Sequence, residues 1–260
     1  REKTTRVRDI LVTTPHTVKT PLPIQSMISL SDLSGTWRRS SIERTNGIID
    51  TTTEVWWMQH LDGFFVDWRR PAQRPSFEGC IGWDNCTSEQ QQYLLSQQGF
   101  SGTLMYDTSR DVWSWTQLFN IHREQLGEVD EGTLQYLDES RLQMQEDALD
   151  HSYREIWMRN VADKSFLPHF HCIVGENIHL LADGQRIVRV SPHKEGQLSC
   201  DISCCLLTKD DALRVPCSQW KVDASILPWR EGQRLLEGES EIKAVTSQLL
   251  SIPTQRERAE

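Results

Sequence analysis

The chain has 260 residues, of which 37% are hydrophobic and 25% are charged, and its formal net charge is −9 at pH 7. This length suits one all-β domain with extensions. The negative charge and the scattered Lys and Arg residues argue against nucleic-acid binding, which needs concentrated positive charge. The apolar runs are too short for a membrane-spanning helix.

Residues 1–30 predict an extended N-terminal arm, because prolines interrupt any helix there and Thr and Val alternate. Strand-like segments begin near Trp37, separated by turn pairs such as Asn46-Gly47 and Asp62-Gly63. The expected strands cover 38–43, 51–60, 64–70, 100–106, 112–119, 132–137, 141–146, 153–159, a hairpin over 178–190, 198–207 and 218–222.

Two helices are expected among these strands. Residues 88–98 have helical propensity and could plug or cap one end of a barrel, and residues 239–250 carry apolar side chains at helical spacing. Many short strands with local turns predict a mainly β fold, an up-and-down antiparallel barrel with short helices and a C-terminal helix. We expect the barrel domain over 31–238, and the helix with its tail over 239–260.

Seven cysteines and one sequon bear on the cellular compartment. Cys80 and Cys86 bracket a short loop, and no paired CxxC motifs predict a structural zinc site. Asn85-Cys86-Thr87 matches the N-glycosylation motif at Asn85. The sequon and the absence of an initiator methionine favour a secretory, oxidising compartment over the cytoplasm. A trimmed chain with a chance sequon is the alternative.

The first expected strand opens with Gly35-Thr36-Trp37, which resembles the Gly-x-Trp signature of lipocalins. In that family the Trp closes the barrel base, so the resemblance implies a lipocalin-like (calycin-type) barrel and a structural role for Trp37. Segments 55–59, 67–70 and 153–157 look more like uncharacterised lipocalin-like proteins of fungi and bacteria. Some fungal barrel proteins of similar layout are cofactor-free cyclases, including hetero-Diels–Alderases. The resemblance covers roughly 33–220 and transfers no catalytic motif.

The hairpin over 54–70 holds the first candidate site, in one of two registers. With a three-residue loop over 61–63, one face carries Trp57, Gln59, Phe65, Asp67 and Arg69. With a two-residue loop over 62–63, Asp67 and Arg69 share a face with Trp56, Met58 and His60. Either face suits an apolar ligand with a polar group. A salt bridge between Asp67 and Arg69 without a ligand is the competing interpretation.

Two other strands carry candidate residues. Alternation places Trp113, Trp115, Gln117 and Phe119 on one face, which predicts a pocket wall or plain core packing. The same alternation places a second set on one face of the later strand, namely Tyr153, Glu155, Trp157 and Arg159. Burial among aromatic rings would raise the pKa of Glu155 and make it a general acid. Pairing with Arg159 would reverse that shift and make the glutamate structural.

No metal site and no cofactor are expected. His169 and His171 share a strand face, but no third ligand is near them in sequence and Cys172 lies on the opposite face. The chain has no Gly-x-Ser-x-Gly elbow, phosphate-binding loop or dinucleotide fingerprint.

Two functions are predicted. The first is a cofactor-independent enzyme of natural-product biosynthesis, a cyclase or isomerase such as a hetero-Diels–Alderase, that shapes an apolar substrate in the barrel. The alternative is a non-catalytic carrier of a hydrophobic small molecule, or a scaffold that meets another protein. The expected catalytic residues are Asp67, Arg69, Gln59 and Glu155, and the expected substrate-binding residues are Trp57, Phe65, Trp113, Trp115, Gln117, Tyr153 and Trp157.

The strand around Trp56 and Trp57 is apolar on both faces. One face belongs to the lumen, so the other needs a cover outside the barrel. The candidates are the C-terminal helix, the N-terminal arm and a second subunit in a homodimer.

Overall fold

The computed structural model describes residues 28–161, 167–195, 198–208 and 215–250. The expected N-terminal arm over 1–30 therefore lies outside the described residues, apart from its last three. No helix in the described part of the chain has the length and apolar character of a membrane span.

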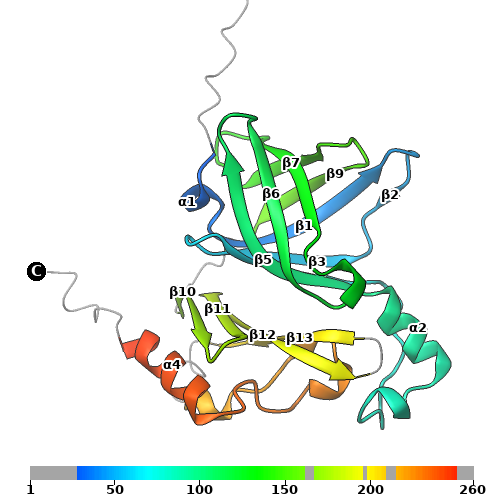
Figure 1. The fold of residues 1–260 in the computed structure, drawn as a ribbon, viewed down its shortest axis with the longest axis vertical. Helices are drawn as coiled ribbons and strands as arrows, with labels where there is room; N and C mark the ends of the chain where they lie inside the picture. The colour runs from blue at the N-terminus through cyan, green and yellow to red at the C-terminus, as the bar shows by residue number, and fades with distance from the viewer. Residues whose placement is uncertain (1–27, 162–166, 196–197, 209–214, 251–260) are drawn as a thin grey trace, which may run out of the picture.

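Within residues 28–161, eight antiparallel strands form a closed up-and-down barrel (Figure 1). Each barrel strand pairs with the next one along the chain, and the last pairs with the first. The mainly β, up-and-down barrel of lipocalin type predicted from the sequence is thus confirmed. Its strands are β1 (Gly35–Arg44), β3 (Glu54–Gln59), β4 (Phe64–Arg70), β5 (Gln98–Asp107), β6 (Val112–Asn120), β7 (Val129–Tyr136), β8 (Gln143–Ala148) and β9 (Tyr153–Arg159), with the short β2 (Ile49–Asp50) beside β1.

The β3–β4 hairpin adopts the three-residue loop. The His60 N–H donates to the Phe64 carbonyl at 2.8 Å, and Gly63 has φ +93°, a left-handed conformation that glycine adopts without strain. Trp57 consequently pairs with Asp67 across the strands. The first of the two registers considered is confirmed, and it directs the Trp57 face of both strands into the lumen.

A short helix closes one end of the barrel. Helix α1 (Leu30–Leu33) begins with a capping box at Ser29 and buries Leu33 completely. Trp37 is also fully buried, and its indole N–H donates to the Leu33 carbonyl at 2.7 Å. The guanidinium of Arg159 lies 4.5 Å from the centre of the Trp37 ring. Trp37 thus occupies the closing position at the barrel base that the resemblance implies.

The strands after Arg159 leave the barrel wall and form a second antiparallel sheet, which lies below the barrel in Figure 1. The division into an arm, one barrel domain over 31–238 and a tail stays a prediction, although the barrel wall itself ends at Arg159. The strands of the second sheet are β10 (Leu167–Val174), β11 (Ile178–Gly184), β12 (Arg186–Glu195), β13 (Leu198–Leu206) and β14 (Ala224–Ser225).

This second sheet covers the outer apolar face of β3 and β4. Met58, Val66 and Trp68 pack in one core with side chains of β12 and β13, including Val188 and Ile202. Of the proposed covers, the C-terminal helix is wrong for this face, because it packs on the far side of the second sheet. The N-terminal arm lies outside the described residues, and a homodimer stays a prediction. Sequence alternation marks the outer face as buried, but it carries no information on which distant segment packs there.

Three further segments differ in how well the sequence predicted them. Helix α4 (Glu239–Leu250) forms as expected and packs against the far face of the second sheet, where Val245 is fully buried. The expected strand over 218–222 is wrong, because a 3₁₀ turn (Cys217–Gln219) and irregular chain occupy it. Helix α2 (Ser88–Ser96) also forms, but Gln97 at its end donates to the Ile226 carbonyl at 3.1 Å, which ties it to the second-sheet layer rather than to a barrel end.

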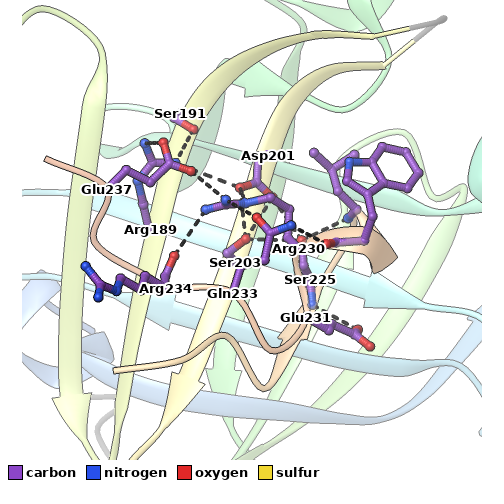
Figure 2. Close-up of polar contacts among 12 residues, drawn as sticks. Arg189, Ser191, Asp201, Ser203, Ser225, Arg230, Glu231, Gln233, Arg234 and Glu237 are labelled. Carbon is purple, nitrogen blue, oxygen red and sulfur yellow. Dashed lines mark hydrogen bonds and ion pairs between the residues drawn. The ribbon is translucent and has the colours of Figure 1, made fainter. Parts of the chain in front are cut away.

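A buried polar network fixes the C-terminal segment onto this far face (Figure 2). Arg189 donates to Glu241 at 2.9 Å and to Ser191 at 2.6 Å. Asp201 accepts hydrogen bonds from Ser203 and Ser225, each at 2.9 Å. These contacts join β12, β13 and β14 to α4, so the network positions the helix on the sheet.

Candidate functional site

The inward side chains of the barrel combine aromatic rings with charged groups. Near α1 they pack around Trp37 and Trp113. Toward the opposite end they surround a space, here named the lumen cavity, of about 20 Å³, which is room for about one water molecule. The lumen cavity is lined by Trp57, Phe65, Asp67, Arg69, Phe100, Trp115, Asp130, Glu146, Tyr153 and Trp157.

Two arginines form ion pairs in the lumen, and Nη1 of Arg69 also lies 3.7 Å from Oε1 of Glu155. Arg69 donates to both oxygens of Asp67, at 2.8 Å from Nε and 3.1 Å from Nη2. Arg39 donates from Nη1 to Oε1 of Glu155 at 2.7 Å, and both side chains are buried. Each arginine therefore neutralises a carboxylate beside it, as buried charges require.

Glu146 is a third buried carboxyl group in the lumen, and it has no ion-pair partner among the described residues. Its Oε1 accepts from the Tyr153 hydroxyl at 2.9 Å, and its Oε2 accepts from the Trp157 indole at 3.0 Å. Burial, together with the nearby negative charge of Glu155, raises the pKa of Glu146 to about 8. Glu146 is therefore mostly protonated at neutral pH.

Asp130 is a fourth carboxyl group and lies at the mouth of the lumen cavity, where it is partly exposed. Gln117 donates to Asp130 at 3.1 Å, and burial raises the pKa of this aspartate. Arg69 and Tyr153 are also partly exposed and line the same end of the barrel. This end, opposite α1, is the side from which a small molecule would reach the cavity.

Most of the residues proposed from the sequence do meet in the lumen. The members that line the lumen cavity are Trp57, Phe65, Asp67, Arg69, Trp115, Tyr153 and Trp157. Three others sit beside it: Trp113 packs deeper toward α1, Gln117 bridges Asp130 and Asn120, and Glu155 lies in its ion pair. Gln59 lies at the α1 end, where it donates to the His60 and Phe64 carbonyls. Their catalytic and binding roles stay predictions.

Two expectations about these strands need correction. Phe119 does not share the Trp115 face, because a β-bulge at Leu118 turns it outward, where it contacts His179. Glu155 pairs with Arg39 rather than with Arg159, whose guanidinium donates to the Ser34 carbonyl near α1. Among the described lumen carboxyl groups, a raised pKa belongs to Glu146 and to Asp130.

The sequence analysis missed Phe100, Asp130 and Glu146 among the cavity-lining residues. A signal for Glu146 was available, since Met144, Glu146 and Ala148 alternate on one face of a short strand, and two of these three are apolar. Asp130 lies outside the expected strand, which begins at 132, whereas the strand in the structure begins at Val129. A polar residue among apolar neighbours on a strand face is the pattern that would have found Glu146.

Three buried polar atoms in the lumen have no hydrogen-bond partner among the described residues. Oε1 of Gln59 lies at the α1 end, and Nε1 of Trp57 and Oε2 of Glu155 lie nearer the lumen cavity. A buried donor or acceptor without a partner destabilises the folded state by about 1–3 kcal/mol. An unused donor and an unused acceptor beside the lumen cavity suggest that a bound molecule or water completes them.

Glu146→Gln is expected to change how stability depends on pH. Between the unfolded pKa of 4.5 and the folded pKa of about 8, folded protein holds a proton that unfolded protein has released. The free energy of unfolding should therefore fall as pH rises through this window, by up to roughly 1 kcal/mol per pH unit from this group. Urea unfolding of both proteins at several pH values measures the difference.

The glutamine variant should lose that slope, so its stability relative to the parent rises with pH. Asp147→Asn is the matched control, since Asp147 is next to Glu146 but points outward to Arg154. A parent-minus-variant difference that stays constant across the window would show that Glu146 does not retain its proton in the fold.

The cysteines and the sequon have defined positions. Cys80 and Cys86 form a disulfide, and the other five cysteines are free. Asn85 lies in an exposed 3₁₀ turn (Trp83–Asn85) beside that disulfide. Its side chain is accessible, and glycosylation there stays a prediction.

No protein-family model and no curated protein matches the sequence. A lipocalin-like protein from Bacteroides uniformis ATCC 8492 is similar with a TM-score of 0.30 and 11% identity, over 49% of this chain and 98% of its own. An uncharacterized protein from Bacteroides eggerthii DSM 20697 also has a TM-score of 0.30, with 10% identity over 48% of this chain and 98% of its own. The barrel is described as lipocalin-type because of its strand order and its closure. The resemblance to fungal cyclases stays a prediction.

Proposed function

We propose that the lumen cavity binds a compact organic cation, a protonated amine on an aromatic or apolar body. The supporting observation is a local excess of carboxyl groups. Arg69 and Arg39 are matched by Asp67 and Glu155, which leaves Glu146 and Asp130 without cationic partners among the described residues. A cation placed between these two groups would pair with Asp130 and, once it ionises, with Glu146.

The walls of the cavity favour the same class of ligand. Trp57 and Trp157 lie edge to face with their ring centres 5.6 Å apart, and Trp57 is 6.2 Å from Trp115 in a similar arrangement. The faces of aromatic rings carry partial negative charge and attract cations. The large apolar surface of the same rings packs against the apolar part of a ligand. Both the enzyme hypothesis and the carrier hypothesis require a small molecule in the barrel, so this part of the proposal is common to them.

The size of the cavity limits how the ligand is bound. The free space of about 20 Å³ is smaller than any aromatic amine, so binding requires side chains to move. Tyr153 stands at the mouth and is partly exposed, so its rotation would enlarge the site without breaking an ion pair. The ligand would then replace the hydrogen bond between Tyr153 and Glu146.

The test compares phenethylamine with its uncharged counterpart 2-phenylethanol, using quenching of intrinsic tryptophan fluorescence in the full chain. The amine should bind about 5- to 30-fold more tightly, since a cation–π contact contributes on the order of 1–2 kcal/mol. Glu146→Gln and Asp130→Asn should each weaken amine binding and leave alcohol binding unchanged. Affinity for the amine should rise as Glu146 ionises near pH 8.

Asp147→Asn again provides the control, because it removes an outward carboxylate from the same strand. Equal affinity for amine and alcohol would refute the cationic ligand but keep a binding barrel. The absence of saturable quenching by either compound would refute ligand binding at this cavity for this size of molecule.

A second candidate is the cofactor-free enzyme, a cyclase or isomerase that includes the hetero-Diels–Alderase type. Its supporting observation is Glu146, a carboxylic acid still protonated at neutral pH within an aromatic-walled lumen. Such a group can donate a proton or a hydrogen bond to a substrate carbonyl. An acid-catalysed reaction should slow as pH passes about 8, whereas a pericyclic reaction should show a flat profile.

A further inference from the structure

A cluster of histidines and one aspartate lies outside the barrel, at the contact between the β3–β4 hairpin and the second sheet. Nδ1 of His60 is 3.0 Å from Oδ1 of Asp62, and Nδ1 of His171 is 2.7 Å from Oδ2 of the same aspartate. One ligand atom from each of these three residues can be chosen so that all lie within 4.8 Å of one another. The spacing is that of groups able to share one ion.

The hairpin places the first two residues of the cluster. Asp62 is in the three-residue loop, and its Oδ1 accepts the backbone N–H of Phe64 at 2.9 Å, which fixes the carboxylate. The Phe64 ring stacks on the His171 ring with centres 4.1 Å apart and planes 4° from parallel. The side chains are thus held in position by contacts that do not depend on an ion.

A fourth residue orients His171. Nε2 of His171 lies 3.0 Å from Nδ1 of His179, on the neighbouring strand β11. A histidine that binds a metal through one ring nitrogen commonly hydrogen-bonds a fixed partner through the other, which sets its tautomer. His179 stands in that position toward His171.

We propose that His60, Asp62 and His171 form a binding site for a divalent transition metal ion such as Zn²⁺, with His179 as a positioning residue. Two imidazoles and one carboxylate suit Zn²⁺, Co²⁺ and Fe²⁺ and leave further coordination positions to water. The side chain of Asp62 is 49% exposed, so the site can be reached from solvent. A bound ion would link the barrel hairpin to the second sheet.

The fold brings to His171 the additional ligands that are not near it in the sequence. No metal was expected because His169 and His171 had no third ligand near them in the chain. In the structure His169 forms a hydrogen bond with Ser34 at 2.8 Å, and the partners of His171 come from a hairpin more than a hundred residues earlier. This site is separate from the lumen cavity, so it is independent of the proposed function.

The experiment titrates Zn²⁺ into the metal-free full chain by calorimetry, with Co²⁺ absorption as a spectroscopic probe. We expect one Zn²⁺ per chain and a higher melting temperature in its presence, because the ion binds only the folded state tightly. His60→Gln and His171→Gln should each weaken binding at least about 100-fold, since loss of an outer partner alone costs about 10–100-fold. His179→Ala should fall within that smaller range.

Two further variants keep the test interpretable. Asp62→Asn retains an oxygen for the Phe64 N–H, so it should fold normally and still lose most of the affinity. His151→Asn is the control, because His151 is exposed in the β8–β9 turn with φ 60°, a conformation that asparagine tolerates. Zn²⁺ affinity that is unchanged in Asp62→Asn and His60→Gln, or a Co²⁺ spectrum with a thiolate charge-transfer band, would overturn the proposal.

Discussion

Replacing Arg189 with methionine is expected to lower the free energy of unfolding by about 3–5 kcal/mol. The guanidinium is buried on the far face of the second sheet and contacts the buried carboxylate of Glu241 at 2.9 Å. It also lies 3.8 Å from the buried carboxylate of Asp201 (Figure 2). Methionine matches much of the arginine's length but provides no charge and no donors. Two carboxylates would then remain in the interior short of positive charge, and Arg230 is the one cation of the described residues that still lies near Asp201.

Urea or thermal unfolding of the variant measures this loss, and Arg154→Met is the matched control. Arg154 contacts Asp147 at 2.7 Å, but the arginine side chain is 53% exposed. Exposed pairs contribute only about 0–1 kcal/mol, so the control should be close to the parent. Equal effects of the two substitutions would mean that the buried Arg189 network contributes no more to the free energy of unfolding than an exposed ion pair does. The apolar contacts of α4 would then be what holds the helix on the sheet.

The hairpin over 54–70 shows which parts of the fold the sequence could determine. Alternation of Trp, Gln, Asp and Arg, together with a glycine at the end of the loop, restricted the register to two possibilities, and the structure adopts one of them. Strand pairing between neighbours in the chain depends on local turn chemistry, which is written in the sequence. The barrel was predictable for this reason, because each of its strands pairs with the next one along the chain.

The second sheet was not predictable in the same way. Strands over 178–206 were recognised, but a strand pattern does not state which sheet the strand joins. The packing of Val188 and Ile202 on Met58 links residues more than a hundred positions apart. Contacts of this kind arise from the match of two apolar faces, and the sequence shows only that each face needs a partner.

In the candidate site, too, residues of one hairpin could be grouped from the sequence, whereas contacts between distant segments could not. Trp57, Asp67 and Arg69 were grouped correctly because they share one hairpin. The ion-pair partner of Glu155 could not be found in the same way, because Arg39 comes from β1, which is 116 residues away in sequence. The bulge at Leu118 had no sequence signal strong enough to reverse the direction of Phe119.

Trp37→Ala is expected to destabilise the protein by about 3–5 kcal/mol, the usual cost of deleting a large aromatic side chain from a core. The ring is fully buried, donates to Leu33 and lies under Arg159, so its loss leaves a cavity at the closed end of the barrel and detaches α1. Thermal unfolding monitored by circular dichroism measures the change. Trp37→Phe keeps most of the ring and loses only the hydrogen bond, so it should cost less.

The same pair of variants separates a structural role for Trp37 from a role in ligand binding. The lumen cavity lies toward the opposite end of the barrel, and Trp37 does not line it. Trp37→Phe should therefore bind phenethylamine with the affinity of the parent protein, while Glu146→Gln does not. A phenylalanine variant that is stable but has lost amine binding would place the ligand deeper in the barrel, against α1, and would contradict both assignments.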